Sequence, residues 1–439
     1  MENKVAIQRF GRIFMKRIRK KLSVAMLTVV LIALAFLVTE KTDVLAANPK
    51  VTAIKQTGTG NDRIYITWNA PIGANSFYVY VSESRDFPQQ QTVIEKSYTN
   101  HTYITGLNAN QTYYIKIIPQ GNDGMYDFSD IVACSTAPEA VTNLRHTSSG
   151  TSSISVSWDV PISGAQYYKI YYKLSGSYMK ETYAGTTTGN SYTITKLADD
   201  TNYNIYVYPV RKSANGFEAM GQDVYVPYAS TVAKANKFSV IKLQRYAASS
   251  ETATISFTNE CRNQSGIEVE VRNLSGKKIK SVKLSRYASY ASFSSSSIKN
   301  KGFQYRLRYY VITDSKYCYG PYTKTKVVIA HPKVTATKKN NSTVQLKWNK
   351  IAKAKSYTVY VSKEESRRYK KVATVKSNTY TLKNIKCGKD YYIYVRANGV
   401  KSGKKSYSST KAIYQPITKV SIYQYTRNAS NYYTTYVTE

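Results

Sequence analysis

Apolar residues recur at every second position in short segments along most of the chain, separated by clusters of Gly, Asn, Ser and Pro. Segments 76–82 (SFYVYVS) and 356–362 (SYTVYVS) show this alternation clearly. A period of two in stretches rich in Val, Ile, Tyr and Thr predicts β-strands with one buried face. Between these strands no segment of about ten residues has helical periodicity, which excludes a parallel β–α–β architecture. The pattern therefore predicts an all-β protein.

Two motifs return along the chain with a shared period. The first is an alternating segment that ends in an aromatic residue, and these aromatic residues are Trp68, Trp158, Phe257 and Trp348. The second is a Leu or Ile followed, six or seven residues later, by a Tyr. These pairs are Leu107 and Tyr113, Leu197 and Tyr203, Ile298 and Tyr305, and Ile385 and Tyr391. The aromatic residues are 90, 99 and 91 positions apart and the tyrosines 90, 102 and 86, so the chain contains four repeats.

A repeat of about ninety residues built from short strands buries a core as a two-sheet sandwich or as a barrel, and we expect the sandwich. The Trp that ends an early strand, and the Leu six residues before a Tyr in a late strand, resemble the fibronectin type III sandwich. The resemblance implies that each Tyr hydroxyl bonds to the backbone a few residues upstream while the ring joins the core. The resemblance implies a role in binding, spacing or adhesion, but it does not identify a ligand.

The resemblance covers residues 49–416, which divide into modules at 49–137, 138–233, 234–331 and 332–416. The third module departs from the pattern, because Phe257 stands in place of Trp and the Tyr motif is one residue longer. Residues 417–439 resemble the opening of the third module. We expect this tail to be either the first strands of an incomplete fifth module or a polar, partly ordered extension.

Residues 1–46 have the order of a secretory signal peptide. Basic residues extend to Lys21, an uncharged apolar run covers 22–38, and the small-residue sequence VLAA follows at 44–47. The alternative is an uncleaved anchor that crosses the membrane through residues 22–38, because 17 residues is near the lower limit for a span. Both readings place the rest of the chain outside the cytoplasm, either secreted or at the cell surface.

The formal net charge of +37 is distributed very unevenly. The net charge is −1 for residues 47–138 and +1 for residues 139–235. It rises to +12 for residues 236–331 and to +19 for residues 332–439. Such an excess produces a long-range positive potential that attracts polyanions. We therefore expect the last two modules to contact an anionic envelope or matrix polymer. The alternative is a solvated basic surface that aids solubility.

The basic residues of the last two modules occur in three runs, 277–286, 367–371 and 401–405. The candidate polyanion-binding residues in these runs are Lys277, Lys278, Lys280, Lys283, Arg286, Arg367, Arg368, Lys370, Lys371, Lys404 and Lys405. Tyrosines near two basic stretches, in RRYKK and SKYCYGPY, are compatible with nucleic acid. No recognised nucleic-acid-binding motif is present, so we treat nucleic acid as a secondary partner.

Tyrosine is unusually abundant, with 43 residues. In YYKIYY (167–172) and YNIYVYPV (203–210) the alternation directs some rings outward on a sheet. Outward rings most often cover sheet surface by packing across strands. Stacking on sugars is the alternative interpretation.

Nothing in the sequence predicts catalysis. The three histidines, His101, His146 and His331, lie in different modules or at their boundaries, outside any known catalytic motif. The four cysteines show no metal-binding spacing, and we expect neither a metal nor a cofactor. Cys261 and Cys318 share a module and could form a disulfide in an oxidising compartment, or all four thiols could stay free.

These observations together predict a non-enzymatic extracellular or cell-surface protein that acts by binding or adhesion. Its partner would be an anionic polymer or another surface protein. The alternatives are a structural stalk without a ligand and a carbohydrate-binding accessory protein.

Overall fold

The computed structural model describes residues 48–246, 251–365, 367–409, 417–427 and 430–438. The predicted signal peptide or anchor over residues 1–46 lies outside the described residues. The described chain is built from strands, and its helical turns are three short 3₁₀ helices, η1 (Gln89–Gln91), η2 (Ala235–Lys237) and η3 (Ser296–Ile298). This confirms the all-β class. Within the described residues, no helix is both long and apolar enough to span a membrane.

The chain forms two compact units. The first contains described residues up to Thr57 together with Tyr65–Tyr103 and Tyr113–Ala133. The second contains Gly58–Ile64, Ile104–Thr112 and the described residues from Cys134 onward.

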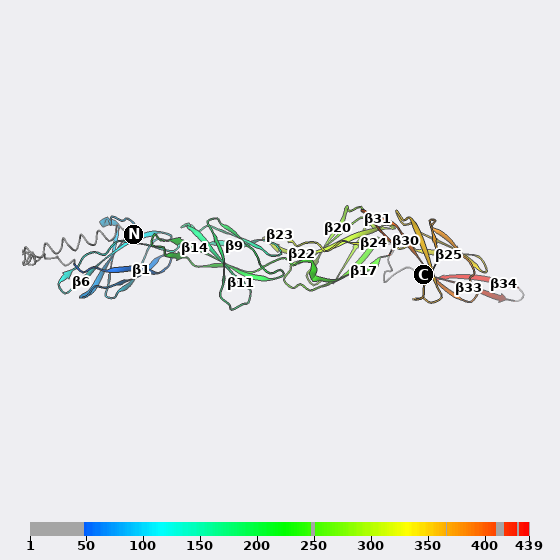
Figure 1. Ribbon diagram of the computed structural model, residues 1–439, viewed down its shortest axis with the longest axis horizontal. Helices are drawn as coiled ribbons and strands as arrows, with labels where there is room; N and C mark the ends of the chain where they lie inside the picture. The colour runs from blue at the N-terminus through cyan, green and yellow to red at the C-terminus, as the bar shows by residue number, and fades with distance from the viewer. Residues whose placement is uncertain (1–47, 247–250, 366, 410–416, 428–429, 439) are drawn as a thin grey trace, which may run out of the picture. The chain divides into compact units, whose positions relative to one another are not determined.

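Four successive segments each contribute a three-stranded antiparallel sheet (Figure 1). In each of these sheets the second strand of the segment lies in the centre. The strands are β1 (Thr52–Thr59), β2 (Arg63–Asn69) and β5 (His101–Thr105); β9 (Thr142–Ser149), β10 (Ile154–Asp159) and β13 (Ser191–Ile194); β17 (Phe238–Tyr246), β18 (Thr252–Asn259) and β21 (Tyr290–Ser294); and β25 (Val334–Asn340), β26 (Thr343–Trp348) and β29 (Thr379–Leu382).

Each segment also contributes a five-stranded antiparallel sheet, which forms the second layer of a sandwich. The strands are β3 (Ala74–Ser82), β4 (Thr92–Ser97), β6 (Thr112–Gly121), β7 (Gly124–Met125) and β8 (Val132–Ser135) in the first sandwich; β11 (Tyr167–Leu174), β12 (Thr182–Thr187), β14 (Asn202–Lys212), β15 (Glu218–Met220) and β16 (Val224–Ser230) in the second; β19 (Gly266–Arg272), β20 (Lys278–Ser285), β22 (Gly302–Thr313), β23 (Lys316–Tyr319) and β24 (Lys326–Ile329) in the third; and β27 (Ser356–Ser362), β28 (Lys370–Val375), β30 (Asp390–Asn398), β33 (Thr418–Arg427) and β34 (Ser430–Thr438) in the fourth. A separate hairpin is formed by β31 (Val400–Ser402) and β32 (Lys405–Tyr407).

The aromatic residue that ends the second strand lies in the core of each sandwich. Trp68, Trp158, Phe257 and Trp348 are at most 3% exposed. The three tryptophans each meet an aromatic ring of the five-stranded sheet edge-on, with ring centroids 5.3 Å (Phe77), 5.1 Å (Tyr168) and 5.6 Å (Tyr357) apart. Phe257 instead meets Phe238 of its own sheet. The third sandwich therefore fills its core differently from the other three.

The Tyr motif forms a corner between the two sheets. The Tyr203 hydroxyl accepts a hydrogen bond from the Ala198 N–H at 3.0 Å, and the Tyr391 hydroxyl accepts one from the Lys386 N–H at 3.1 Å. In the first sandwich the Tyr113 hydroxyl donates to Glu83 Oε1 at 3.2 Å. In the third sandwich Tyr246, from β17, donates to the Ile298 carbonyl.

All four motif tyrosines are buried, as are three of their Leu or Ile partners, and Leu107 is half-buried. The buried residues are Tyr113, Leu197, Tyr203, Ile298, Tyr305, Ile385 and Tyr391. The motif thus adds apolar contacts to the hydrogen bonds of the corner.

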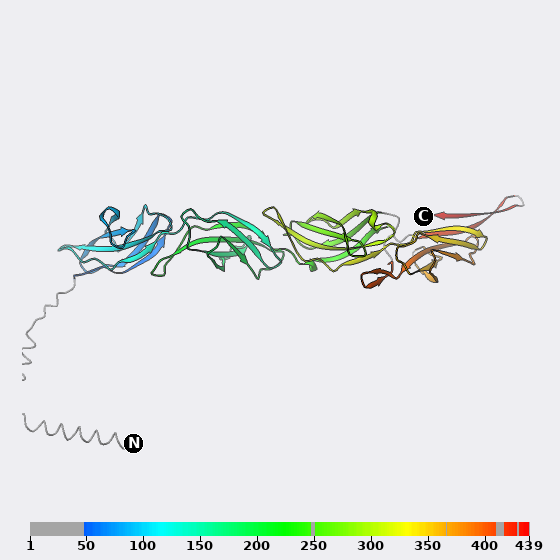
Figure 2. The ribbon, with the colours of Figure 1, turned by 90° about the horizontal axis from the view of Figure 1, so that it is seen from above.

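The chain after residue 416 completes the fourth sandwich. Strand β33 pairs with β30, Val420 lying opposite Tyr391, in the position that β8, β16 and β24 take in the other sandwiches. Val420 and Ile422 are fully buried, and the Thr418 hydroxyl donates to the Val334 carbonyl at 2.8 Å. Strand β33 also forms a hairpin with β34, which is the edge strand of this sheet (Figure 2).

The boundary expected at residue 416 is therefore wrong. Strand β33 is neither the start of a separate fifth module nor a polar extension, because its alternating apolar residues face the core of the fourth sandwich.

We expect Val420→Asp to unfold the fourth sandwich at neutral pH, because it places an unpaired charge in that core. The matched substitution Val372→Asp, on β28 where the side chain is 41% exposed, should change stability by less than about 1 kcal/mol. Denaturant unfolding followed by tryptophan fluorescence would compare the two variants. Equal stability of both variants would show that residues after 416 do not belong to this core.

Candidate polyanion-binding surface

The first run of candidate residues lies on the edge of a sheet. Strand β20 is the outermost strand of the five-stranded sheet in the third sandwich. The turn that leads into it is closed by Asn273, whose side-chain oxygen accepts from the Ser275 and Lys277 N–H groups. Gly276 has a φ of 95°, a backbone conformation that side chains disfavour. This turn holds the run at a fixed position.

All five candidate residues of this run, from Lys277 to Arg286, are exposed. Among the described residues, the structure pairs none of these five with a carboxylate. The Lys283 ammonium lies 3.2 Å from the centre of the Tyr317 ring, a cation–π contact. Positive charge along β20 is thus largely unneutralised.

The third basic run, 401–405, lies beside the start of the first, 277–286. The Leu274 carbonyl in the β19–β20 turn accepts hydrogen bonds from Ser402 Oγ and Gln304 Nε2, each at 3.2 Å. Because Ser402 ends β31, this contact holds the β31–β32 turn with Lys404 and Lys405 beside the turn that carries Lys277. We call Lys277, Lys278, Lys404 and Lys405 the junction group.

A small cavity lies next to the junction group. Its volume is about 120 Å³, and Leu274 and Ser275 of the β19–β20 turn form part of its wall. Lys301 and Lys353, both exposed, also line it. These two lysines were absent from the sequence-based candidates because each is isolated in sequence from the basic runs.

The second run lies elsewhere. Arg367, Arg368, Lys370 and Lys371 follow the end of β27 at Ser362, whereas β31 follows β30 beside the start of β27, where Ser356 pairs with Asn398. At about 3.3 Å per strand residue the two ends of β27 are roughly 20 Å apart. We call Arg367, Arg368, Lys370 and Lys371 the distal group.

The two arginines of the distal group are already paired. Arg367 Nε lies 2.5 Å from Glu364 Oε2, and Arg368 Nη1 lies 3.1 Å from Glu364 Oε1. An anion would have to compete with Glu364 for both guanidinium groups. The candidate residues therefore do not form one surface, and the junction group and β20 are the more available part.

A buried ion-pair network lies on the outer face of the third sandwich, next to β20. Glu268 and Glu270 are only 3% and 5% exposed. Arg308 pairs with Glu268, Arg306 Nε lies 2.8 Å from Glu270 Oε1, and Arg272 also pairs with Glu270. Sequence analysis did not find this network, although the alternation of charges in EVEVR (268–272) and RLR (306–308) carried a signal.

The network fixes the protonation state of its carboxylates. Burial alone would raise the pKa of Glu270, but hydrogen bonds from Arg272 and Arg306 lower this pKa to about 2. The Tyr322 hydroxyl donates to both carboxylates at 3.1 Å. Because each arginine is held by a carboxylate, the network adds little free positive charge to the face.

The histidines and cysteines form no reactive centre among the described residues. Burial lowers the pKa of His146 and of His331 to about 4, so both are neutral at pH 7. Cys261 and Cys318 are free thiols, and the disulfide considered from the sequence is not formed. Cys318 Sγ instead accepts a hydrogen bond from the Ser149 N–H at 3.3 Å. No group of three metal-binding side chains occurs in the described chain.

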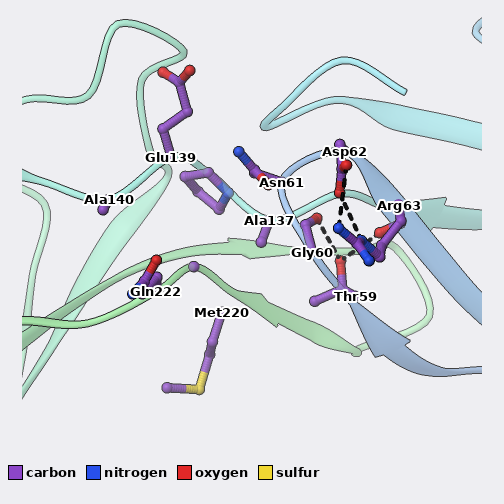
Figure 3. Close-up of a pocket in the computed structure, with 12 residues that line it drawn as sticks. Thr59, Gly60, Asn61, Asp62, Arg63, Ala137, Glu139, Ala140, Met220 and Gln222 are labelled. Carbon is purple, nitrogen blue, oxygen red and sulfur yellow. Dashed lines mark hydrogen bonds and ion pairs between the residues drawn. The ribbon is translucent and has the colours of Figure 1, made fainter. Parts of the chain in front are cut away.

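The second unit also contains a larger, open pocket of about 500 Å³ (Figure 3). Arg63 Nε lies 2.7 Å from Asp62 Oδ1, and Glu139 Oε2 accepts from the Ser163 N–H at 3.3 Å. The Glu139 side chain points away from Asp62 and Arg63 (Figure 3). The charged groups of this pocket are therefore satisfied by neighbouring protein groups, and we do not assign it a ligand.

Comparison with known proteins identifies the fold of two segments. The fibronectin type III domain family matches residues 138–224 and 330–412, which hold most of the second sandwich and most of the fourth. These two segments are therefore similar to fibronectin type III domains. This similarity is consistent with a binding or structural role.

Relatives match only parts of the chain. A Kelch domain-containing protein from Saccharolobus solfataricus is 24% identical over 197 residues, which is 43% of this chain and 26% of the relative. Neogenin from Rattus norvegicus is 28% identical over 186 residues, 39% of this chain and 13% of the relative. The chain thus spans about a quarter of the first relative and an eighth of the second.

Solved structures that match part of the chain include the FN1–FN3 domains of chicken CNTN1, with a TM-score of 0.28 and 13% identity. That match covers 65% of this chain and 99% of the other. A two-domain fibronectin type III segment from chicken tenascin has a TM-score of 0.24 and 16% identity, and covers 41% of this chain and 97% of the other.

We expect Glu270→Gln to lower the free energy of unfolding at pH 7 by about 2 to 3 kcal/mol, because it leaves two arginines without their shared carboxylate. The pKa of Glu270 is about 2 when folded, below its usual 4.5, so its stabilisation is complete above pH 4.5 and is lost as the pH falls to 2. Urea unfolding at several pH values would show that the free energy of unfolding depends less steeply on pH in the variant than in the parent chain.

Glu251→Gln is the matched control. Glu251 pairs with Lys299 at 3.6 Å on the exposed surface, and such pairs contribute less than about 1 kcal/mol. If both variants showed the same small decrease in the free energy of unfolding, the buried network would not stabilise the third sandwich.

Proposed function

We propose that the protein is a non-enzymatic, extracellular or cell-surface binding protein whose third and fourth sandwiches bind an anionic envelope or matrix polymer. The observation that carries this proposal is the junction group beside β20, where exposed lysines from two turns lie together without carboxylate partners among the described residues. We further infer that all four sandwiches are modules of the fibronectin type III type.

The first two sandwiches act as a spacer in this proposal. Their sequences are nearly neutral, at −1 for residues 47–138 and +1 for residues 139–235, so they have no general attraction for a polyanion. A long-range positive field from the last two sandwiches would guide the polymer to the junction group. Direct contacts with ammonium groups would then hold it there.

Two other functions make different predictions. A structural stalk would bind no polyanion at low ionic strength. A nucleic-acid-binding protein would prefer single-stranded nucleic acid over a saccharide or teichoic polymer of equal charge density, because the bases could stack on tyrosines near the basic runs.

The test compares two variants of the full chain that each lose four positive charges. Lys277, Lys278, Lys404 and Lys405 are replaced by Gln in the junction variant. Arg367, Arg368, Lys370 and Lys371 are replaced by Gln in the distal variant. The probes are purified teichoic acid, a sulfated polysaccharide and single-stranded DNA, each titrated from about 50 to 500 mM salt.

We expect the junction variant to bind the preferred polymer roughly a thousandfold more weakly and with a smaller salt dependence, since each of the four lysines near an anionic surface contributes about 1 kcal/mol. The distal variant should lose less than about a hundredfold in affinity, because Glu364 offsets part of the charge of Arg367 and Arg368. Equal losses of affinity in the two variants would mean that binding depends on the net charge of the chain and not on the position of the lysines. No binding by the parent chain at low salt would leave the stalk as the better description.

A further inference from the structure

The second sandwich carries an aromatic face that the polyanion site does not use. Its five-stranded sheet directs five tyrosine rings outward from four strands, β11, β12, β14 and β16. They are Tyr171, Tyr183, Tyr206, Tyr208 and Tyr225. Neighbouring centroids are 5.3 Å (Tyr171 to Tyr183), 5.4 Å (Tyr171 to Tyr208) and 5.1 Å (Tyr206 to Tyr225) apart. We call these five residues the tyrosine face.

The tyrosine face is open to solvent at its two sides. Tyr183 and Tyr225 are 53% and 52% exposed, and Tyr171 and Tyr208 are half-buried between them. Tyr206 is buried, with the Tyr225 ring stacked on it. A broad aromatic surface therefore extends over the width of the sheet.

The outward positions contain no aliphatic side chain over the centre of this face. From Lys169 to Lys173 on β11, and from Asn204 to Tyr208 on β14, they carry only Tyr, Lys and Asn. Protein interfaces usually have an apolar core with few charged groups. An amphipathic surface of rings and hydroxyls fits a ligand with both C–H and O–H groups better.

The charges on the face are neutralised within it. Lys173 Nζ lies 2.9 Å from Glu181 Oε1, and Lys169 pairs with Glu218. Burial, together with the nearby Asp223 and Glu181 carboxylates, raises the pKa of Tyr208 to about 12. The local potential is thus not positive, which disfavours an anionic ligand here.

The same positions differ in the other sandwiches. Strand pairing aligns the Tyr171–Tyr206 pair with Tyr80–Lys116, Glu270–Arg306 and Tyr360–Tyr394. In the first sandwich Lys116 lies over three aromatic rings, and in the fourth Arg396 lies 5.4 Å from the centre of the Tyr360 ring. In the second sandwich both positions are Tyr, and Lys173, which lies 5.1 Å from the centre of the Tyr206 ring, is paired with Glu181.

We propose that the tyrosine face binds an uncharged polysaccharide, with its sugar rings stacked on the tyrosines and its hydroxyls bonded to the hydroxyl, amide and carboxylate groups around them. Rigid aromatic side chains provide such contact area at a low cost in conformational entropy. This site is independent of the polyanion site, since it lies in another sandwich and uses no basic run.

The test is binding of the full chain to a panel of neutral polysaccharides: β-1,4-glucan, β-1,3-glucan, α-mannan and chitin oligosaccharides. Affinity electrophoresis and calorimetry would be performed at about 50 and 500 mM salt. We expect one member to bind with an affinity that salt leaves unchanged, and Tyr183→Ala together with Tyr225→Ala to weaken it at least tenfold. These two side chains are half exposed, so their loss leaves the core intact.

Two controls separate this site from general effects. Tyr178→Ala removes a fully exposed tyrosine outside the tyrosine face and should leave binding unchanged. The junction variant should bind the neutral polymer as the parent does, so that failure of the polyanion proposal would not affect this result.

Absence of binding to every neutral polymer would overturn the proposal. It would also be overturned if Tyr183→Ala and Tyr225→Ala left polysaccharide binding intact but abolished self-association of the chain in sedimentation, because the face would then be a protein interface. Binding that disappears at high salt would assign the saccharide to the basic surface instead.

Discussion

The burial of one large aromatic residue from the second strand against the opposite sheet is the contact on which the first, second and fourth sandwiches depend. Trp68, Trp158 and Trp348 each meet an aromatic ring of the five-stranded sheet at 5.1 to 5.6 Å. This contact fixes the separation of the two layers and the direction in which every alternating residue points. Once the inner faces are set, the outer faces are free to differ in chemistry.

The outer faces of the five-stranded sheets show how far that freedom extends. A single aligned pair of positions holds Tyr and Lys, two Tyr, Glu and Arg, or two Tyr again in the successive sandwiches. The first three strands of each sheet keep one order, as in β12-β11-β14 and β28-β27-β30. The chain thus combines a constant scaffold with outer faces of different charge and polarity, and function should be sought on those faces.

The periodicity of the sequence was sufficient to predict the fold class and the burial of the aromatic core residues and motif tyrosines, because each depends on spacing along one strand. The expected bond from the Tyr hydroxyl to the backbone upstream forms at Tyr203 and Tyr391, whereas Tyr113 bonds to Glu83 and Tyr246 makes the corner bond in the third sandwich. Pairing between strands was not predictable. The neutralisation of Glu268 by Arg308 depends on a register that brings together residues 40 positions apart. The final strand was also missed, because Val420 and Ile422 show their alternation only over a few residues and their partner strand lies before them in sequence.

The candidate basic residues were found correctly as runs, but the runs did not reveal their arrangement. Glu364 stands three residues before Arg367 and four before Arg368, a spacing that favours ion pairs. The net charge of the segment did not reveal this pairing. The contact between the β19–β20 turn and the β31–β32 turn had no local signal in the sequence, because it joins two different sandwiches.

The position of the lysines on β20 and β28 has a further consequence. Both strands are open edges of their sheets, and an open edge presents unpaired N–H and C=O groups to any strand that approaches. Lysines along such an edge keep two copies apart by repulsion. If the same charges were neutralised by a bound polyanion, that repulsion would fall, and the colloidal behaviour of the chain would then depend on the ratio of polymer to protein.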